Sequence, residues 1–260
     1  MFCLPCRAFS FSALFAISLF CAPANSQELN LVLLMRHFET LIAPTALDYL
    51  PKISRWEEPV KANVYALSDT ALITRQRVEA AFAAWGQQTG LSISFVKPGE
   101  TIVPNTVKFQ LVIGSADVWD RFENEYFFVE AGESKAEKQS RARLVAGRGR
   151  RNSQENHMGC ETQGYFKPDG PLVYVYGVIS ERGIPSKDCF HSVYWAVSGL
   201  AALPTSGAPS VFDGSKRYET FTAYDLAVIR LLYSPPVYPG MSKVEAVRSV
   251  RQVLGLSYHR

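Results

Sequence analysis

The chain has 260 residues, of which 27 are Lys or Arg and 24 are Asp or Glu, giving a formal net charge of +3. Charges that balance this closely do not favour a nucleic-acid-binding protein. The length suits one sizeable hydrophobic core and is short for two, and no internal repeat or low-complexity tract divides the chain.

The N-terminal stretch MFCLPCRAFSFSALFAISLFCAPANSQ is typical of a secretory signal peptide. Arg7 precedes an apolar run, Phe9–Ala22, that is shorter than the about 20 residues a membrane-spanning helix needs. Small residues come just before a cleavage site at Gln27. We therefore expect residues 1–26 to be removed and the protein to be exported, to the periplasm or the medium, with no transmembrane segment left. An uncleaved membrane anchor is the alternative.

Three of the five cysteines lie in that leader, so the mature chain keeps Cys160 and Cys189. An even pair in an oxidising compartment predicts one disulfide, and two buried free thiols are the alternative. The bridge would close a loop of about 30 residues and stabilise the fold by roughly 3.5 kcal/mol in the chain-entropy model. Two distant cysteines do not favour structural zinc, which needs four ligands, usually in close pairs.

The mature chain is expected to begin with a lead-in, residues 27–52. Within it, residues 29–34 are predicted to be a short strand or a tether, and residues 36–49 a short helical or irregular segment. Residues 59–65 alternate weakly between apolar and polar side chains and predict a strand.

A helix is expected next, because Ser68, Asp69 and Thr70 all offer N-caps. One buried stripe at helical spacing consists of Val78, Ala81, Phe82 and Trp85. Gly86 and Gly90 mark the end of this helix. Residues 91–95 and 107–113 then alternate as strands buried on one face, with Pro98 and Gly99 predicting a turn between them.

The middle of the chain is less regular. Residues 117–128 are predicted to form a short helix over the sheet, and residues 132–151 a polar segment that ends in a basic cluster. The cluster consists of Arg141, Arg143, Arg148, Arg150 and Arg151. It could bind an anionic envelope polymer, or it could be a solvated loop balanced by nearby glutamates. Arg148, Arg150 and Arg151 are kept as candidate ligand-binding residues.

The C-terminal half predicts one buried strand followed by helices. Residues 172–179, LVYVYGVI, are rich in β-branched and aromatic residues. A helix is expected at residues 189–203, stopped by Pro204, and then a loop at 206–215. Capping boxes at 222–225 and 242–245 begin two further helices. The elements together predict a single α/β (α+β) domain over residues 27–260, in which a twisted mixed sheet packs against long helices.

Two parts of the chain resemble the metzincin zinc proteases of the matrixin type. AFAAWGQQTGLSISFV (81–96) and VKFQLVIG (107–114) resemble their opening helix and strands. PSVFDGSKRYETFTAYDLAVIRLLY (209–233) resembles their C-terminal part, with Phe212 in the place of the methionine in the turn below the metal. The resemblance implies a zincin-like fold.

From about Ile53 to Ser242 the chain also resembles a bacterial exported family catalogued as domain of unknown function 2927. The stretches that carry this resemblance are ISRWEEPVKANVY (53–65), the helix at 189–203, SVFDG (210–214) and LLYSPPVYPGMS (231–242). This family has no assigned activity, so the resemblance implies a fold and an export route but no reaction.

The helix at 189–203 decides whether the zinc protease resemblance extends to catalysis. In the motif His-Glu-x-x-His-x-x-Gly-x-x-His, three histidines bind zinc and the glutamate is the general base. With Gly199 as the motif glycine, the ligand positions fall on Ser192, Ala196 and Ala202, and the base falls on Val193. The unknown-function family implies a glutamate and a glutamine in this helix, where Val193 and Ala196 stand instead. These side chains cannot form a catalytic zinc site.

The remaining histidines do not replace the missing ligands. His191 lies one residue too early, about 100° around the helix from the first ligand position. His37 and His157 have no partners at metal-binding spacing. The group Asp188, His191 and Ser192 has the composition of a hydrolase triad, but adjacent residues on a helix do not face each other.

We therefore expect a protein without a metal or another cofactor, which acts as a non-catalytic binding or structural protein of the cell envelope. Its partner would be a polypeptide held as an added strand at the sheet edge, or an anionic polymer. His191 is a further candidate ligand-binding residue. The alternative is a hydrolase or peptidase whose catalytic residues lie outside the motif, with Glu161, Asp213 and His191 as candidates.

Overall fold

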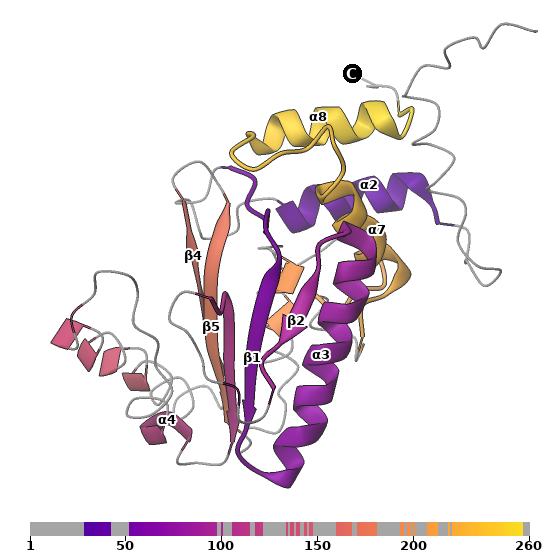
Figure 1. Ribbon diagram of the computed structural model, residues 1–260. Helices are drawn as coiled ribbons and strands as arrows, with labels where there is room; N and C mark the ends of the chain where they lie inside the picture. The colour runs from indigo at the N-terminus through magenta and orange to yellow at the C-terminus, as the bar shows by residue number, and fades with distance from the viewer. Residues whose placement is uncertain are drawn as a thin grey trace, which may run out of the picture.

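A five-stranded sheet in the order β2-β1-β3-β5-β4 organises the structure, which is a computed structural model (Figure 1). The structure describes residues 29–42, 52–97, 100, 106–114, 118–121, 134, 136–137, 139–140, 143–144, 146–147, 160–167, 171–180, 193–194, 197–198, 200, 207–212, 218 and 220–256. The strands are β1 (Val60–Ala66), β2 (Ile93–Phe95), β3 (Phe109–Gly114), β4 (Cys160–Phe166) and β5 (Leu172–Ser180). Four strands are parallel, and the edge strand β4 runs antiparallel to β5. The predicted mixed α/β class is confirmed.

Helices cover both faces of this sheet. They are α2 (Leu31–Ile42), α3 (Asp69–Thr89), α4 (Val118–Arg121), α7 (Ala223–Leu232) and α8 (Lys243–Val253). Helix α3 runs along one face, α4 lies at the other, and α2, α7 and α8 gather beyond one end of the sheet (Figure 1). Among the described residues, no helix has both the length and the apolar character needed to cross a bilayer.

Helix α3 forms where its caps predict it. Ser68 Oγ accepts a hydrogen bond from the Ala71 N–H at 3.1 Å. Gly90 ends the helix with φ of 73°, a left-handed conformation that glycine adopts without strain. The predicted stripe is buried, and its Phe82 ring meets the Phe109 ring of β3 edge to face, with the centroids 4.7 Å apart. This stripe fixes α3 to the sheet.

The prediction that β3 is buried on one face only is wrong. All six residues of β3 are buried, because helix α3 covers one face of the strand and the layer that contains α4 covers the other. Central strands of parallel sheets are commonly covered on both faces. Moreover, β2 does not pair with β3, since β1 lies between them. The turn predicted at residues 98–99 lies outside the described residues.

The N-terminal lead-in contains a helix rather than a strand. Residues 31–42 form α2, so the strand or tether predicted for residues 29–34 is wrong from Leu31 onward. The apolar side chains that α2 buries are Leu34, Met35, Phe38, Leu41 and Ile42. Their spacing of three and four residues is that of one helix face. This face joins α2 to the main hydrophobic core.

The middle of the chain differs from its prediction in two respects. Residues 136–137, 139–140, 143–144 and 146–147 are helical, so the alternative that the basic cluster at 141–151 is a solvated loop is wrong at residues 143–144 and 146–147. Ala146 is fully buried in the small cluster on the α4 side of the sheet. Strand β4 was not predicted at all, because CETQGYF lacks the apolar alternation of a half-buried strand.

Candidate functional site

Most of the sequence-predicted site residues lie outside the described part of the chain. This holds for Cys189, His191, Asp213 and the arginines Arg148, Arg150 and Arg151. Glu161 belongs to the edge strand β4. Cys160 is the first residue of β4 and is buried. The predicted disulfide and the predicted ligand-binding residues therefore stay predictions.

The helix expected to carry the zinc motif can be followed at four positions. Val193, Tyr194, Val197 and Ser198 are helical and buried. Val193, which the zinc protease resemblance predicts to replace the glutamate, is only 1 % exposed and belongs to the main core. The predicted packing of Val193 against the core is thus confirmed, whereas Ser192, Ala196 and Ala202 lie outside the described residues. An apolar side chain in an apolar setting cannot act as a general base.

Trp56 connects this helix to the rest of the site. Its side chain is buried, and its indole Nε1–H donates to the Val197 carbonyl at 3.1 Å. Its backbone N–H donates to the Tyr233 hydroxyl at 3.1 Å. Burial raises the pKa of the Tyr233 phenol, so this hydroxyl stays neutral and keeps its own proton. Trp56 therefore holds the 193–200 segment against the end of α7.

Arg55 extends the same junction to the C-terminal end of α7. Its Nη1–H donates to the Leu232 carbonyl at 2.5 Å, and its guanidinium lies 5.2 Å from the Tyr233 ring centroid. A cation is favourable here because the last carbonyls of a helix carry partial negative charge. Burial lowers the pKa of Arg55 from its ordinary value. Residues 53–65, 193–200 and 231–242, which carry the family resemblance, thus meet at Arg55 and Trp56.

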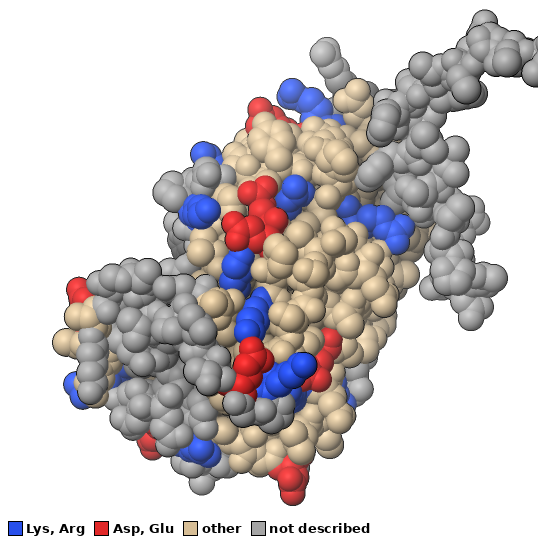
Figure 2. Space-filling view, viewed as in Figure 1, with Lys and Arg blue, Asp and Glu red and all other residues tan. Residues whose placement is uncertain are grey.

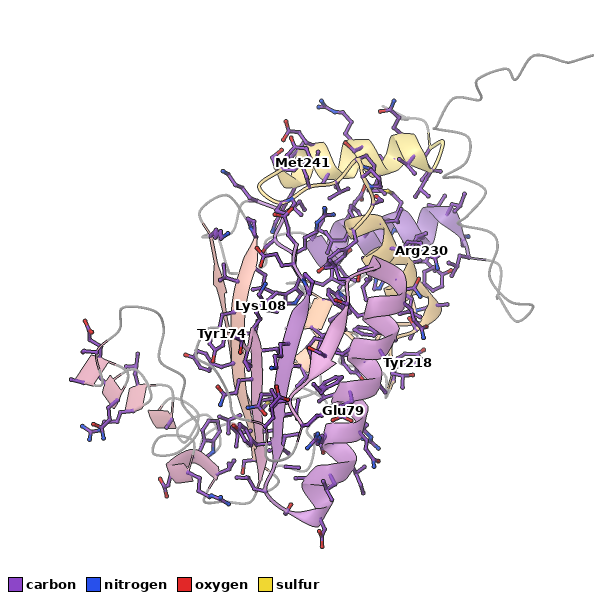
Figure 3. The ribbon with its side chains drawn as sticks, viewed as in Figure 1. Glu79, Lys108, Tyr174, Tyr218, Arg230 and Met241 are labelled. Atoms are coloured by element: carbon purple, nitrogen blue, oxygen red, sulfur yellow. The ribbon has the colours of Figure 1, made fainter. Side chains whose placement is uncertain are left out.

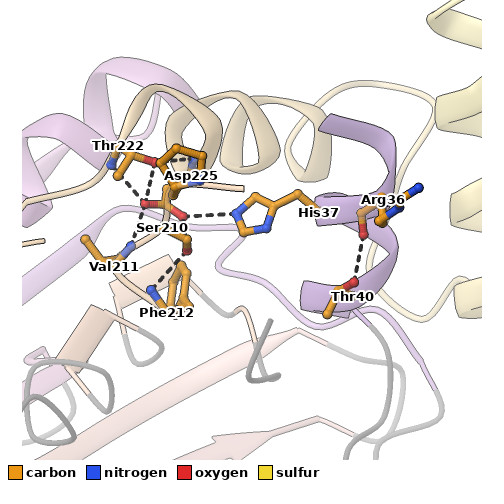
Figure 4. A network of polar contacts seen from close by, with 9 residues as sticks. Arg36, His37, Thr40, Ser210, Val211, Phe212, Thr222 and Asp225 are labelled. Carbon is orange, nitrogen blue, oxygen red and sulfur yellow. Dashed lines mark hydrogen bonds and ion pairs between the residues drawn. The ribbon is translucent and has the colours of Figure 1, made fainter. Parts of the chain in front are cut away.

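Asp225 is fully buried and is the centre of a second polar network (Figure 4). Its Oδ2 accepts from the Val211 N–H at 3.0 Å and from the Thr222 N–H at 2.9 Å. Its Oδ1 accepts from Ser210 Oγ at 2.5 Å and lies 3.2 Å from His37 Nε2. Since a carboxylate so surrounded by donors is an acceptor, His37 Nε2 carries the proton toward it. The network joins α2, α7 and the turn at 210–212.

The network contains Ser, His and Asp but does not have the geometry of a hydrolase triad. In a triad the histidine lies between the serine and the carboxylate. Here Asp225 lies between Ser210 and His37, and the serine hydroxyl donates to the carboxylate. All three residues are also fully buried, so no substrate reaches them. The arrangement orders the turn at 210–212 rather than activating a nucleophile.

The ordered turn contains Phe212, the residue for which the sequence resemblance predicted the role of the turn methionine. The Phe212 N–H donates to Ser210 Oγ at 3.0 Å, and the ring is buried beside Phe221. Sequence reasoning found the Thr222–Asp225 capping box but missed His37, which was dismissed for lack of nearby partners. The apolar residues around His37 recur at helical spacing, and this pattern could have placed His37 on a buried helix.

Within the described ranges, no three His, Cys, Asp or Glu side chains gather so that they could hold a metal ion. The buried His37–Asp225 pair, with Ser210 and two backbone amides around it, offers no position for a cation. The described residues of this region thus form a stabilising framework, in which Val193 is part of the apolar core.

Comparison with known proteins agrees with the second resemblance. No curated protein matches the chain. A family model described as protein of unknown function (DUF2927) matches residues 199–252. The matched segment contains α7, all but the last residue of α8, and the turn that Asp225 supports. In this segment the chain is similar to the DUF2927 family, whose description assigns no activity.

Proposed function

We propose that this protein is an exported, non-catalytic protein of the cell envelope, built on a zincin-like scaffold, which binds a polypeptide along the edge of its sheet. The observation that carries the loss of catalysis is the burial of Val193 in the main core. A catalytic glutamate would have to face a solvent-accessible metal-bound water at that position. A buried isopropyl group instead stabilises the helix against the sheet.

Strand β4 supports the binding role. It ends the strand order of the sheet and is the one antiparallel strand among those described. An edge strand can pair with an extended polypeptide through main-chain hydrogen bonds. The central strands β1 and β3 have neighbours on both sides and cannot take part in such pairing. Of the two edge strands, β4 is longer than β2, so the polypeptide would add beside β4.

The first prediction is that the purified protein retains no stoichiometric zinc after dialysis against trace zinc and cleaves no peptide in a random library. Metal analysis and mass spectrometry of the library measure the two results. A single change, Val193→Glu, should restore neither, because the ligand positions would still lack histidines. About one tightly held zinc ion per chain, lost in His191→Ala, would contradict the proposal.

Polypeptide binding is tested separately, by amide hydrogen exchange with peptides from the same library. Peptides selected from the library on the immobilised protein should slow amide hydrogen exchange in β4 and leave exchange in the other edge strand, β2, unchanged. Slowed exchange in β2, or no change in β4, would overturn the assignment of this edge.

The second prediction is a disulfide between Cys160 and Cys189 in the exported chain. Cys160 begins β4 opposite Ile179 of β5, so the bridge would tie this end of the β4–β5 pair to the segment that precedes the helical residues Val193 and Tyr194. Mass spectrometry of peptides from unreduced protein should find the two cysteines linked, and reduction should separate them. Two thiols that react with an alkylating agent in the native protein would refute the bridge.

A further inference from the structure

We draw no further inference here: the strongest candidate, the surface patch of alternating positive and negative side chains (Figure 2) to which Lys61 at the start of β1 and Lys108 just before β3 (Figure 3) belong, carries nothing, because Lys61 is paired with Glu100 and Lys108 with Glu58, so that no charge is left to select a ligand.

Discussion

Replacing Asp225 by alanine is expected to lower the free energy of unfolding by about 4 kcal/mol, because several buried donors lose their shared acceptor at once. The change leaves Ser210 Oγ, the Val211 N–H and His37 Nε2 without their acceptor in a fully buried site. It also removes the capping box of α7. Each buried donor left unpaired costs about 1–3 kcal/mol, so the loss exceeds that of an ordinary helix cap. Urea unfolding followed by circular dichroism measures the effect.

Two further variants separate the network from the cap. Asp225→Asn retains one carbonyl oxygen but turns an NH₂ group toward donors on the other side, so it should remain less stable than the unchanged protein. Asp69→Ala removes an exposed carboxylate from the first turn of α3 and should cost no more than about 1 kcal/mol. If Asp225→Ala cost no more than this control, the network would have no role in stability.

Replacing Trp56 by alanine should cost about 4 kcal/mol, the usual range for an aromatic residue removed from a core. The indole is 1 % exposed, and its loss leaves a cavity in the main hydrophobic core. It also leaves the Val197 carbonyl without the donor that now reaches it at 3.1 Å. Trp56→Phe fills most of the volume but cannot donate the hydrogen bond. Its stability should lie between those of the unchanged protein and Trp56→Ala.

The matched control for Trp56 is Tyr238→Ala, an exposed aromatic residue whose loss should change stability by no more than about 0.5 kcal/mol. Thermal melts of the three Trp56 proteins and this control give the order of stabilities. A Trp56→Ala variant as stable as the Tyr238 variant would show that the 193–200 segment is held by contacts other than Trp56.

The sequence predicted those features that depend on residues close together in the chain. The capping box at Thr222–Asp225 is confirmed, since both of its hydrogen bonds span three residues. The other contacts of Asp225 are with residues 14 to 188 positions away in the chain. The periodicity of the sequence does not predict contacts over such distances. His37 therefore looked solitary in the sequence, although it is one of the most buried polar residues in the structure.

Two elements were misjudged because their apolar patterns are ambiguous. In α2, the run LVLLM is too short to distinguish a strand from a helix, and Phe38, Leu41 and Ile42 were needed to reveal the helical spacing. Strand β4 shows the opposite difficulty, because the mostly polar CETQGYF has no periodic signal until β5 is known to lie beside it. The position of Val193, by contrast, followed from the sequence once Gly199 fixed the register, and its burial is confirmed.

The contacts of α2 also determine when this helix can join the folded structure. The backbone of Asn30 and the side chains of His37 and Glu39 contact Tyr224, Asp225 and Arg251, across separations of 194, 188 and 212 residues. Contacts so distant in the chain form slowly, because the entropy of closing the loop is lost before any contact forms. Helix α2 leaves the ribosome early but can dock only after α7 and α8 have been made. A nascent chain therefore lacks the closing contacts of its fold until synthesis is nearly complete.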